Sequence, residues 1–240
     1  HLKGSIDLAR IPSSFEKVIG VTPERLGANP DGVTDTAALF RTWTTSSGRK
    51  ETIEGSKFNL INWPGNPFSF AAASKTDLKG STVLQNLTLN SNNQLSVIEA
   101  GAEVTGLNWL VEGSNFFRRG FQMQPGSKIK GFHIKSENPS PAGQGYDSRS
   151  HVLGVYGKGI VIEDGIIDGF IQRNIHGSQD VVGNGRTTIR NVEFRNYSAG
   201  PGMTNLPGSL VDGLFARGIH PQAAPTPGNN ILTGGAPHSV

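Results

Sequence analysis

A short apolar pattern recurs along residues 79–220 and constrains the fold more than any other feature of this sequence. Each copy has an apolar residue, an apolar residue or glycine three positions later, and a further apolar residue two positions after that. The first positions of successive copies lie 20, 25, 33, 27 and 21 residues apart. A repeat of this length is typical of solenoids, in which each coil buries its inward face only against its neighbours. The six copies are Leu84/Leu87/Leu89, Val104/Leu107/Trp109, Ile129/Phe132/Ile134, Ile162/Gly165/Ile167, Ile189/Val192/Phe194 and Leu210/Gly213/Phe215.

A second short apolar stretch precedes several copies, and a glycine follows it within a few residues. Each repeat therefore predicts a strand, a tight turn, a second strand and a loop of variable length. An antiparallel sandwich or barrel is the alternative architecture. We favour the solenoid, because the Asn-Gly turns of hairpins are scarce and the strand pairs repeat in order. The stretches are Val97-Ile98, Phe121/Met123, Leu153/Val155 and Val181-Val182, and the glycines are Gly101, Gly126, Gly157 and Gly183.

Residues 26–43 combine a turn with the start of a helix. Turn residues gather at 27–32, where glycine allows positive φ and proline fixes φ. Thr34 or Asp35 can then accept hydrogen bonds from the first free N–H groups of a helix. We expect a short helix over about residues 35–46 that covers the end of the solenoid, where a sheet would otherwise have an open edge. Apolar residues follow at roughly helical spacing: Ala38, Leu39 and Trp43.

The same stretch resembles the N-terminal motif of the pectate-lyase-like superfamily, which reads F-G-A-x-G-D-G-V-T-D-D-T-x-A followed by an apolar residue. Leu26 stands in place of the aromatic residue, Asn29-Pro30 replaces x-Gly, and one Asp is missing before Thr36. Residues 53–60, Ile-Glu-Gly-Ser-Lys-Phe-Asn-Leu, are similar to the family's next strand. The resemblance implies an all-β fold, a right-handed single-stranded parallel β-helix. The superfamily includes phage tailspikes, polysaccharide lyases, glycoside hydrolases and uronan epimerases.

We expect three parts along the chain. Residues 1–25 form a lead-in with one strand near 17–21, and residues 26–220 form the parallel β-helix domain. Residues 221–240 form a Pro/Gly-rich C-terminal tail or a last partial coil. Catalytic β-helices usually have more coils, so we interpret the chain as a short or truncated member of this class.

The composition excludes several classes of protein. The chain has no cysteine, which excludes disulfides, thiolate metal sites and a cysteine nucleophile. No apolar run approaches the roughly 18 residues that a membrane-spanning helix needs, and no Lys/Arg-rich tract or RNA-binding signature is present. We therefore expect neither a membrane nor a nucleic acid as partner. The formal net charge of +3 and the pI near 9.3 suit an anionic polysaccharide, because opposite charge steers association.

The longest gap between copies, residues 137–151, collects polar side chains among prolines and glycines. A lyase acting on a uronan needs a cation against the carboxylate, a base for the C5 proton and an acid at the leaving oxygen. Arg149, His151 and Tyr146 have these chemical types and are our candidate catalytic residues. Asp147 is a candidate substrate-binding residue, and a polar surface loop is the alternative interpretation.

Pairs of arginine and histidine recur in and after this gap. If the coils stack in register, these pairs could form a basic ladder that fits an extended anionic glycan; ordinary polar turn residues are the alternative. Two registers compete for this stretch. Alignment of the Asp-Gly pairs at 168–169 and 212–213 places Gly169 with Gly213, whereas the apolar pattern places Gly165 with Gly213, four residues away. The pairs are Arg149/His151, Arg173/His176 and Arg217/His220, and Arg173, His176, Arg217 and His220 are candidate substrate-binding residues.

Hydrolysis is the other chemistry to consider, and it needs two carboxyl groups about 5–5.5 Å or 6.5–9.5 Å apart. We select Glu163 and Asp168 as candidate catalytic carboxylates. Calcium is weakly allowed at Asp164 and Asp168, but no D-x-D-x-D-G loop or histidine spacing indicates a metal site, so no cofactor is expected. His133 alternates with apolar neighbours and should point away from the core. The acidic candidates are Glu163, Asp164, Asp168, Asp180, Glu193 and Asp212.

Two functions from different classes remain open. The first is a lyase or glycosidase that binds and depolymerises an acidic bacterial exopolysaccharide or capsule, as a phage tailspike or secreted enzyme. A uronan C5-epimerase is a variant of it. The second is a non-catalytic structural or receptor-binding virion appendage. The resemblance also suggests a homotrimer that is extracellular or on a virion surface.

Overall fold

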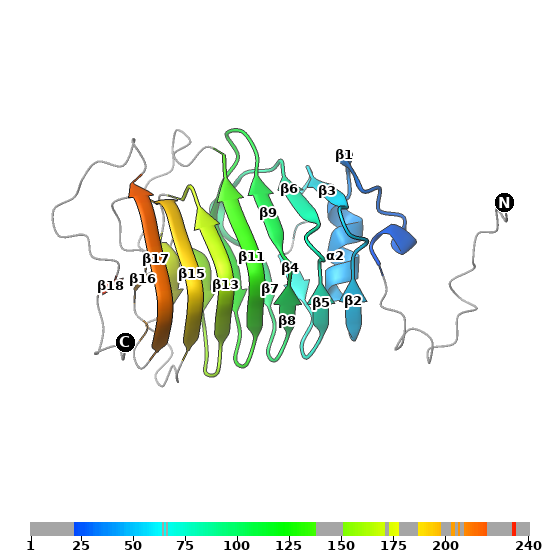
Figure 1. Ribbon diagram of the computed structural model, residues 1–240. Coiled ribbons are helices and arrows are strands. Elements are labelled where there is room, and N and C mark those ends of the chain that lie inside the picture. Colours follow the sequence, from blue (N-terminus) through cyan, green and yellow to red (C-terminus); the bar gives the residue numbers. More distant parts are fainter. Residues whose placement is uncertain are drawn as a thin grey trace.

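The computed structural model describes residues 22–63, 65, 67–137, 151–170, 173–177, 187–197, 203–204, 206, 209–219 and 232–233. In this part of the chain, parallel strands coil into a β-solenoid of about six turns, with its N-terminal end at the right of Figure 1. The fold is a right-handed parallel β-helix with one helix near the N-terminal end, as the sequence predicted.

Two parallel sheets form the wall of the solenoid, and all their strand pairs are parallel. From β11 onward one long strand per coil replaces the two shorter strands of earlier coils in the larger sheet. Sheet A contains β1 (Asp31–Asp35), β2 (Arg49–Glu51), β3 (Lys57–Leu60), β5 (Lys75–Asp77), β6 (Thr82–Gln85), β8 (Glu103–Thr105), β9 (Asn108–Val111), β11 (Lys128–Ser136), β13 (Val161–Asp168), β15 (Thr188–Tyr197) and β17 (Leu210–Ile219). Sheet B contains β4 (Phe68–Phe70), β7 (Leu89–Ile98), β10 (Phe117–Met123), β12 (His151–Val155), β14 (Arg173–Gly177), β16 (Met203–Thr204) and β18 (Leu232–Thr233).

The four central copies of the apolar pattern stack in the predicted register. Ile129, for example, pairs with Val104 on one side and with Ile162 on the other. The side chains of these rows fill the space between the sheets, and most of them are fully buried. The register rows are Val104–Ile129–Ile162–Ile189, Leu107–Phe132–Gly165–Val192 and Trp109–Ile134–Ile167–Phe194.

The prediction was wrong for the last copy, which is shifted by one residue. Val211 pairs with Ile189 and Leu214 pairs with Val192, so Phe215 lies on the outer face and is 52% exposed. Neither predicted match for Gly213 is formed, because Gly213 lies opposite Asn191.

The predicted register of the first copy, Leu84/Leu87/Leu89, was also wrong. Thr76 pairs with Val104 and Val83 pairs with Trp109, which places two extra residues between these positions. Leu89 instead begins β7 in sheet B. Val181-Val182 lie outside the described residues, and the strand that pairs with β12 is β14.

A stacked column of left-handed residues bends every long strand of sheet A. Its members with positive φ are Gly106, Gly131, Asp164, Asn191 and Gly213. A Cβ on Gly106 would lie 3.1 Å from backbone nitrogens of the preceding coil, so glycine is needed there. Later coils use Asp and Asn, which tolerate this conformation, and Asn191 Nδ2 donates to Asp164 Oδ1 at 3.0 Å.

Helix α2 (Ala37–Thr45) covers the N-terminal end of the core. Phe40 is fully buried, with its ring centroid 5.6 Å from Phe58 and 5.8 Å from Phe68. The expected apolar set was wrong at Ala38, which is exposed. The buried residues of the helix are Ala37, Phe40, Trp43 and Thr44.

Asp35 joins the start of α2 to the end of β3. Its Oδ1 accepts the backbone N–H groups of Ala37 and Ile61, both at 3.1 Å, and its Oδ2 accepts Asn62 Nδ2 at 2.7 Å. Burial raises the pKa of Asp35, but the hydrogen bonds from Ala37, Ile61 and Asn62 outweigh it, so the pKa lies below the ordinary 3.8. The sequence expectation of a cap at Asp35 is confirmed, whereas the Thr34 hydroxyl donates to Asp31.

Asp35→Ala is expected to lower the free energy of unfolding by about 1 kcal/mol at neutral pH, through loss of these bonds. Because the folded-state pKa is lowered, the carboxylate stabilises the fold above the unfolded pKa and loses this effect as pH falls through the folded pKa. Urea unfolding at neutral pH and at pH about 2.5 measures the difference. Glu54→Ala, at an exposed site, is the control; a difference that persists at low pH would contradict this role of the carboxylate.

Candidate functional site

The predicted site residues do not form one cluster. The expected ladder of three Arg/His pairs was wrong, because Arg173 and His176 belong to β14 of sheet B whereas Arg217 belongs to β17 of sheet A. Glu163 and Asp168 also lie in sheet A, and His151 begins β12 of sheet B. Four candidates fall outside the described residues: Tyr146, Asp147, Arg149 and His220.

Ion pairs between neighbouring coils cover much of the outer face of sheet A. Glu163 lies between Lys130 and Arg190 in register, and its Oε2 is 3.0 Å from Lys130 Nζ while its Oε1 is 3.4 Å from Arg190 Nη1. Both oxygens of this predicted catalytic carboxylate therefore face cations. Such a group is better placed to hold the coils together than to donate a proton.

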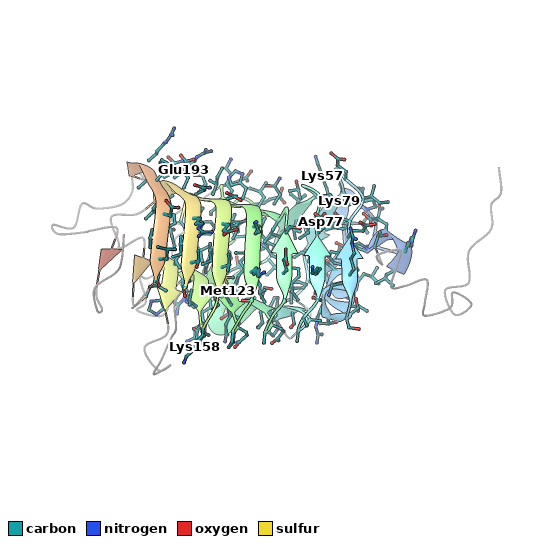
Figure 2. The ribbon with its side chains drawn as sticks, turned by 60° about the horizontal axis from the view of Figure 1, so that its bottom comes forward. Lys57, Asp77, Lys79, Met123, Lys158 and Glu193 are labelled. Atoms are coloured by element: carbon teal, nitrogen blue, oxygen red, sulfur yellow. The ribbon has the colours of Figure 1, made fainter. Side chains whose placement is uncertain are left out.

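Glu193 holds two arginines on the same face, and Figure 2 shows it on the opposite side of the solenoid from Lys158. Its Oε2 accepts from Arg195 Nη2 at 2.6 Å, and its Oε1 lies 3.0 Å from Arg217 Nε. The hydrogen bond from Arg195 lowers the pKa of Glu193; burial opposes this effect, and the charges of Arg195 and Arg217 add to it. The Arg217 side chain is 75% exposed, and no described residue pairs with its two terminal amino groups.

A shallow hollow of about 370 Å³ lies beside this pair. The exposed ring of Phe215 forms one wall, next to the aliphatic side chain of Ile166 and to Arg217. An aromatic face beside an arginine can bind a flat sugar ring and an anionic substituent together. The lining residues are Asp164, Gly165, Ile166, Asn191, Glu193, Phe215 and Arg217.

His133 lies in the same row of the outer face. The row runs His133–Ile166–Glu193–Phe215 across β11, β13, β15 and β17, which confirms that His133 points away from the core. His133 Nε2 is 3.9 Å from Asp168 Oδ2, and Asp168 Oδ1 accepts Asn196 Nδ2 at 2.8 Å.

The surroundings of His133 favour its neutral form. Burial lowers the pKa of His133 below the ordinary 6.5; the charge of Asp168 opposes this, and those of Arg195 and Lys135 add to it. A neutral imidazole next to a carboxylate can accept a proton near pH 7. His133 was absent from the predicted catalytic set, although its outward position and the register of the central copies were both legible in the sequence.

His151, by contrast, is only 1% exposed. Its ring is stacked on that of His176 at 5.9 Å and lies 6.2 Å from the ring of Tyr156. Gly154 makes this cluster possible, because a Cβ there would lie 2.6 Å from His151 Nε2. A buried imidazole of this kind is poorly placed to take a proton from a large substrate.

The described ranges contain neither a cluster of metal-binding side chains nor a membrane-spanning helix. There, no group of three or more His, Asp or Glu side chains is arranged to hold a metal ion. Asp164 and Asp168, the weak calcium candidates, accept hydrogen bonds from Asn191 and Asn196. No helix among the described residues is long and apolar enough to cross a membrane.

Comparisons of the chain with protein-family models, with curated proteins and with solved structures gave no match.

Proposed function

We propose that this chain is a carbohydrate-active β-helix protein of the pectate-lyase-like type, which binds an acidic bacterial exopolysaccharide or capsule and cleaves it as a lyase. The observation that carries the proposal is the hollow of sheet A, where exposed Phe215 adjoins Arg217. The resemblance of residues 26–36 to the superfamily motif supports it, as does the solenoid fold. An extracellular or virion-surface location and a homotrimer belong to the same proposal.

Binding would use the two walls of the hollow. The flat face of Phe215 offers apolar contact to a sugar ring. The free amino groups of Arg217 can bind a carboxylate through two hydrogen bonds, while Glu193 holds the guanidinium in place through Nε. The ligand carboxylate would then lie close to two positive charges, those of Arg217 and Arg195.

The row across the sheet suggests how cleavage would proceed. Ile166 lies between His133 and Glu193, and two strand spacings amount to about 10 Å. A uronate ring resting on Ile166 would have the base on one side and the arginines on the other. His133 takes the C5 proton, the C–H electrons form a C4=C5 double bond, and the C4–O bond breaks. The departing oxygen takes a proton from solvent, and the arginines stabilise the charge that develops on the carboxylate.

Hydrolysis finds less support at this face. A general acid needs a raised pKa, whereas the pKa of Glu193 is lowered and Glu163 faces two cations. A C5-epimerase would share the first proton transfer and return the proton to the other face of the ring.

A non-catalytic receptor-binding appendage is the second candidate. It is favoured by the same ion pairs, since Glu163 and Glu193 are engaged in holding neighbouring coils together. Recognition would need only Phe215 and Arg217. Incubation with a panel of polyuronates separates the candidates: ultraviolet absorbance of an unsaturated product indicates elimination, new reducing ends without it indicate hydrolysis, and binding without either indicates the appendage.

Arg217→Ala and Phe215→Ala are each expected to weaken binding of the polyuronate by about tenfold, because each removes one wall contact worth about 1–1.5 kcal/mol. Isothermal titration calorimetry measures the dissociation constants. Lys158→Ala is the charge-matched control, since Lys158 is exposed on the other side of the solenoid (Figure 2). Weakening by Lys158→Ala as large as that by Arg217→Ala would show a general charge effect, and unchanged binding in Phe215→Ala would remove the aromatic contact; either result would contradict the assignment of the hollow.

A further inference from the structure

A second row of outward side chains crosses sheet A beside the row that contains His133. Each of its members lies two residues after a member of that row, so both rows face the same side of the sheet. Its charge is positive on β11, negative on β13 and positive again on β15 and β17, which lie side by side (Figure 1). The row runs Lys135–Asp168–Arg195–Arg217.

We propose that Lys135 is a further substrate-binding residue of this face, and that it binds the carboxylate of a uronate two sugars away from the uronate held by Arg195 and Arg217. This inference rests on the proposed function and narrows its substrate class. The substrate is an extended glycan in which the acidic groups on one side of the chain recur at every second sugar. At least three sugars are then needed to reach both positions.

Lys135 offers an exposed cation to such a chain. Ile134, the preceding residue of β11, is fully buried, so the Lys135 side chain points away from the core. No described carboxylate forms an ion pair with Lys135, in contrast to Lys130 on the same strand, whose Nζ is 3.0 Å from Glu163 Oε2. Burial is the main cause of the lowered pKa of His133, and the charge of Lys135 adds to it. Lys135 therefore lies near enough to the proposed base to contact the same glycan.

The spacing of the positive positions fits a polymer that runs along the solenoid axis. Lys135 and Arg195 are two strands apart in register, which amounts to about 10 Å. One strand spacing is close to the length of one sugar in an extended glycan. In a flat, twofold ribbon of sugars, substituents on one side recur at every second sugar. If the uronate on Ile166 directs its carboxylate toward Arg195, the next carboxylate on the same side reaches Lys135.

Asp168 separates these cations and disfavours an anion between them. Its side chain is held in place, because Oδ1 accepts Asn196 Nδ2 at 2.8 Å and Oδ2 lies 3.9 Å from His133 Nε2. A glycan with an acidic group on every sugar of this side would bring one of these groups against Asp168. Such a contact between like charges is unfavourable and selects against that ligand. The order of charges along the row thus favours alternation.

The test compares binding of β-1,4-linked oligomannuronates of two and of six sugars by wild type and by Lys135→Ala, using isothermal titration calorimetry. The variant is expected to bind the hexasaccharide about tenfold more weakly, through loss of one charge-assisted contact, and the disaccharide as wild type does. Lys135→Arg keeps the charge and should keep the affinity. Lys128→Ala removes the same charge from an exposed site at the other end of β11 and should bind both oligomers as wild type does.

Chain length separates this inference from the proposed function. Arg217→Ala is expected to weaken binding of both oligomers, because the hollow takes a sugar of either. Weakening of both by Arg217→Ala with no effect of Lys135→Ala would leave the hollow standing and overturn the role of Lys135. Equal weakening of both oligomers by Lys135→Ala would show a general charge effect and would also overturn that role. Absence of hexasaccharide binding by wild type would overturn this inference, whereas the polyuronate panel still decides the proposed function.

Discussion

Gly165→Val is expected to lower the free energy of unfolding by about 3 kcal/mol, the upper end of the cost of overpacking a core. A Cβ at position 165 would lie 2.0 Å from Cζ and 2.1 Å from Cε1 of Phe132, which is its register partner on β11. The Phe132 ring is 2% exposed, so it has little room to move. Gly165 does not have positive φ, so the cost arises from space and not from backbone conformation.

A double-mutant cycle tests this explanation by urea unfolding. Phe132→Ala removes the ring that occupies the space, so Gly165→Val should cost much less in that background than in wild type. An equal cost in both backgrounds would show that the ring is not the obstacle. Glycine at this position is thus a packing residue of the core, in a row whose other members are Leu107, Phe132 and Val192.

The central coils could be predicted from sequence because three apolar positions recur there at constant spacing. The last coil could not be placed by apolar residues alone, since both Leu210 and Val211 could be the first position of the pattern. The left-handed column decides the register, because Gly213 continues the positive-φ stack of Asp164 and Asn191. Each member of that column lies two residues after the first apolar position, a regularity that a search for apolar residues does not use.

The candidate site was harder to predict for a different reason. Sequence spacing showed that Glu193 and Arg217 are polar positions, but their ion pair depends on which coils are adjacent and on the one-residue shift of β17. The same shift moves Phe215 from the expected core to the surface. His151 shows the opposite change: it lies at the end of a polar stretch of the sequence, but its side chain is buried. Chemical type alone therefore selected a histidine that the structure places in the interior.

His133→Gln is expected to reduce the rate of polyuronate cleavage by about 10²–10⁴-fold, the usual contribution of a general base. Glutamine keeps a polar side chain of similar size but cannot take the C5 proton. In wild type, the rate should rise with pH as His133 loses its proton and should level off below neutrality, because the pKa of His133 is lowered. Initial rates of ultraviolet-absorbing product between about pH 4.5 and 8 measure both effects.

Asp168→Asn tests how the charge of Asp168 affects His133, because asparagine has a similar size but no charge. The Asp168 carboxylate favours protonated His133, so its removal should move the acidic limb of the pH profile to still lower pH, with a smaller loss of rate. Glu54→Gln removes one carboxylate charge at an exposed site outside the hollow, so as the control it should leave the cleavage rate and the acidic limb unchanged. Cleavage that survives His133→Gln with an unaltered pH profile would remove His133 from the reaction, and the remaining role of this face would be recognition through Phe215 and Arg217.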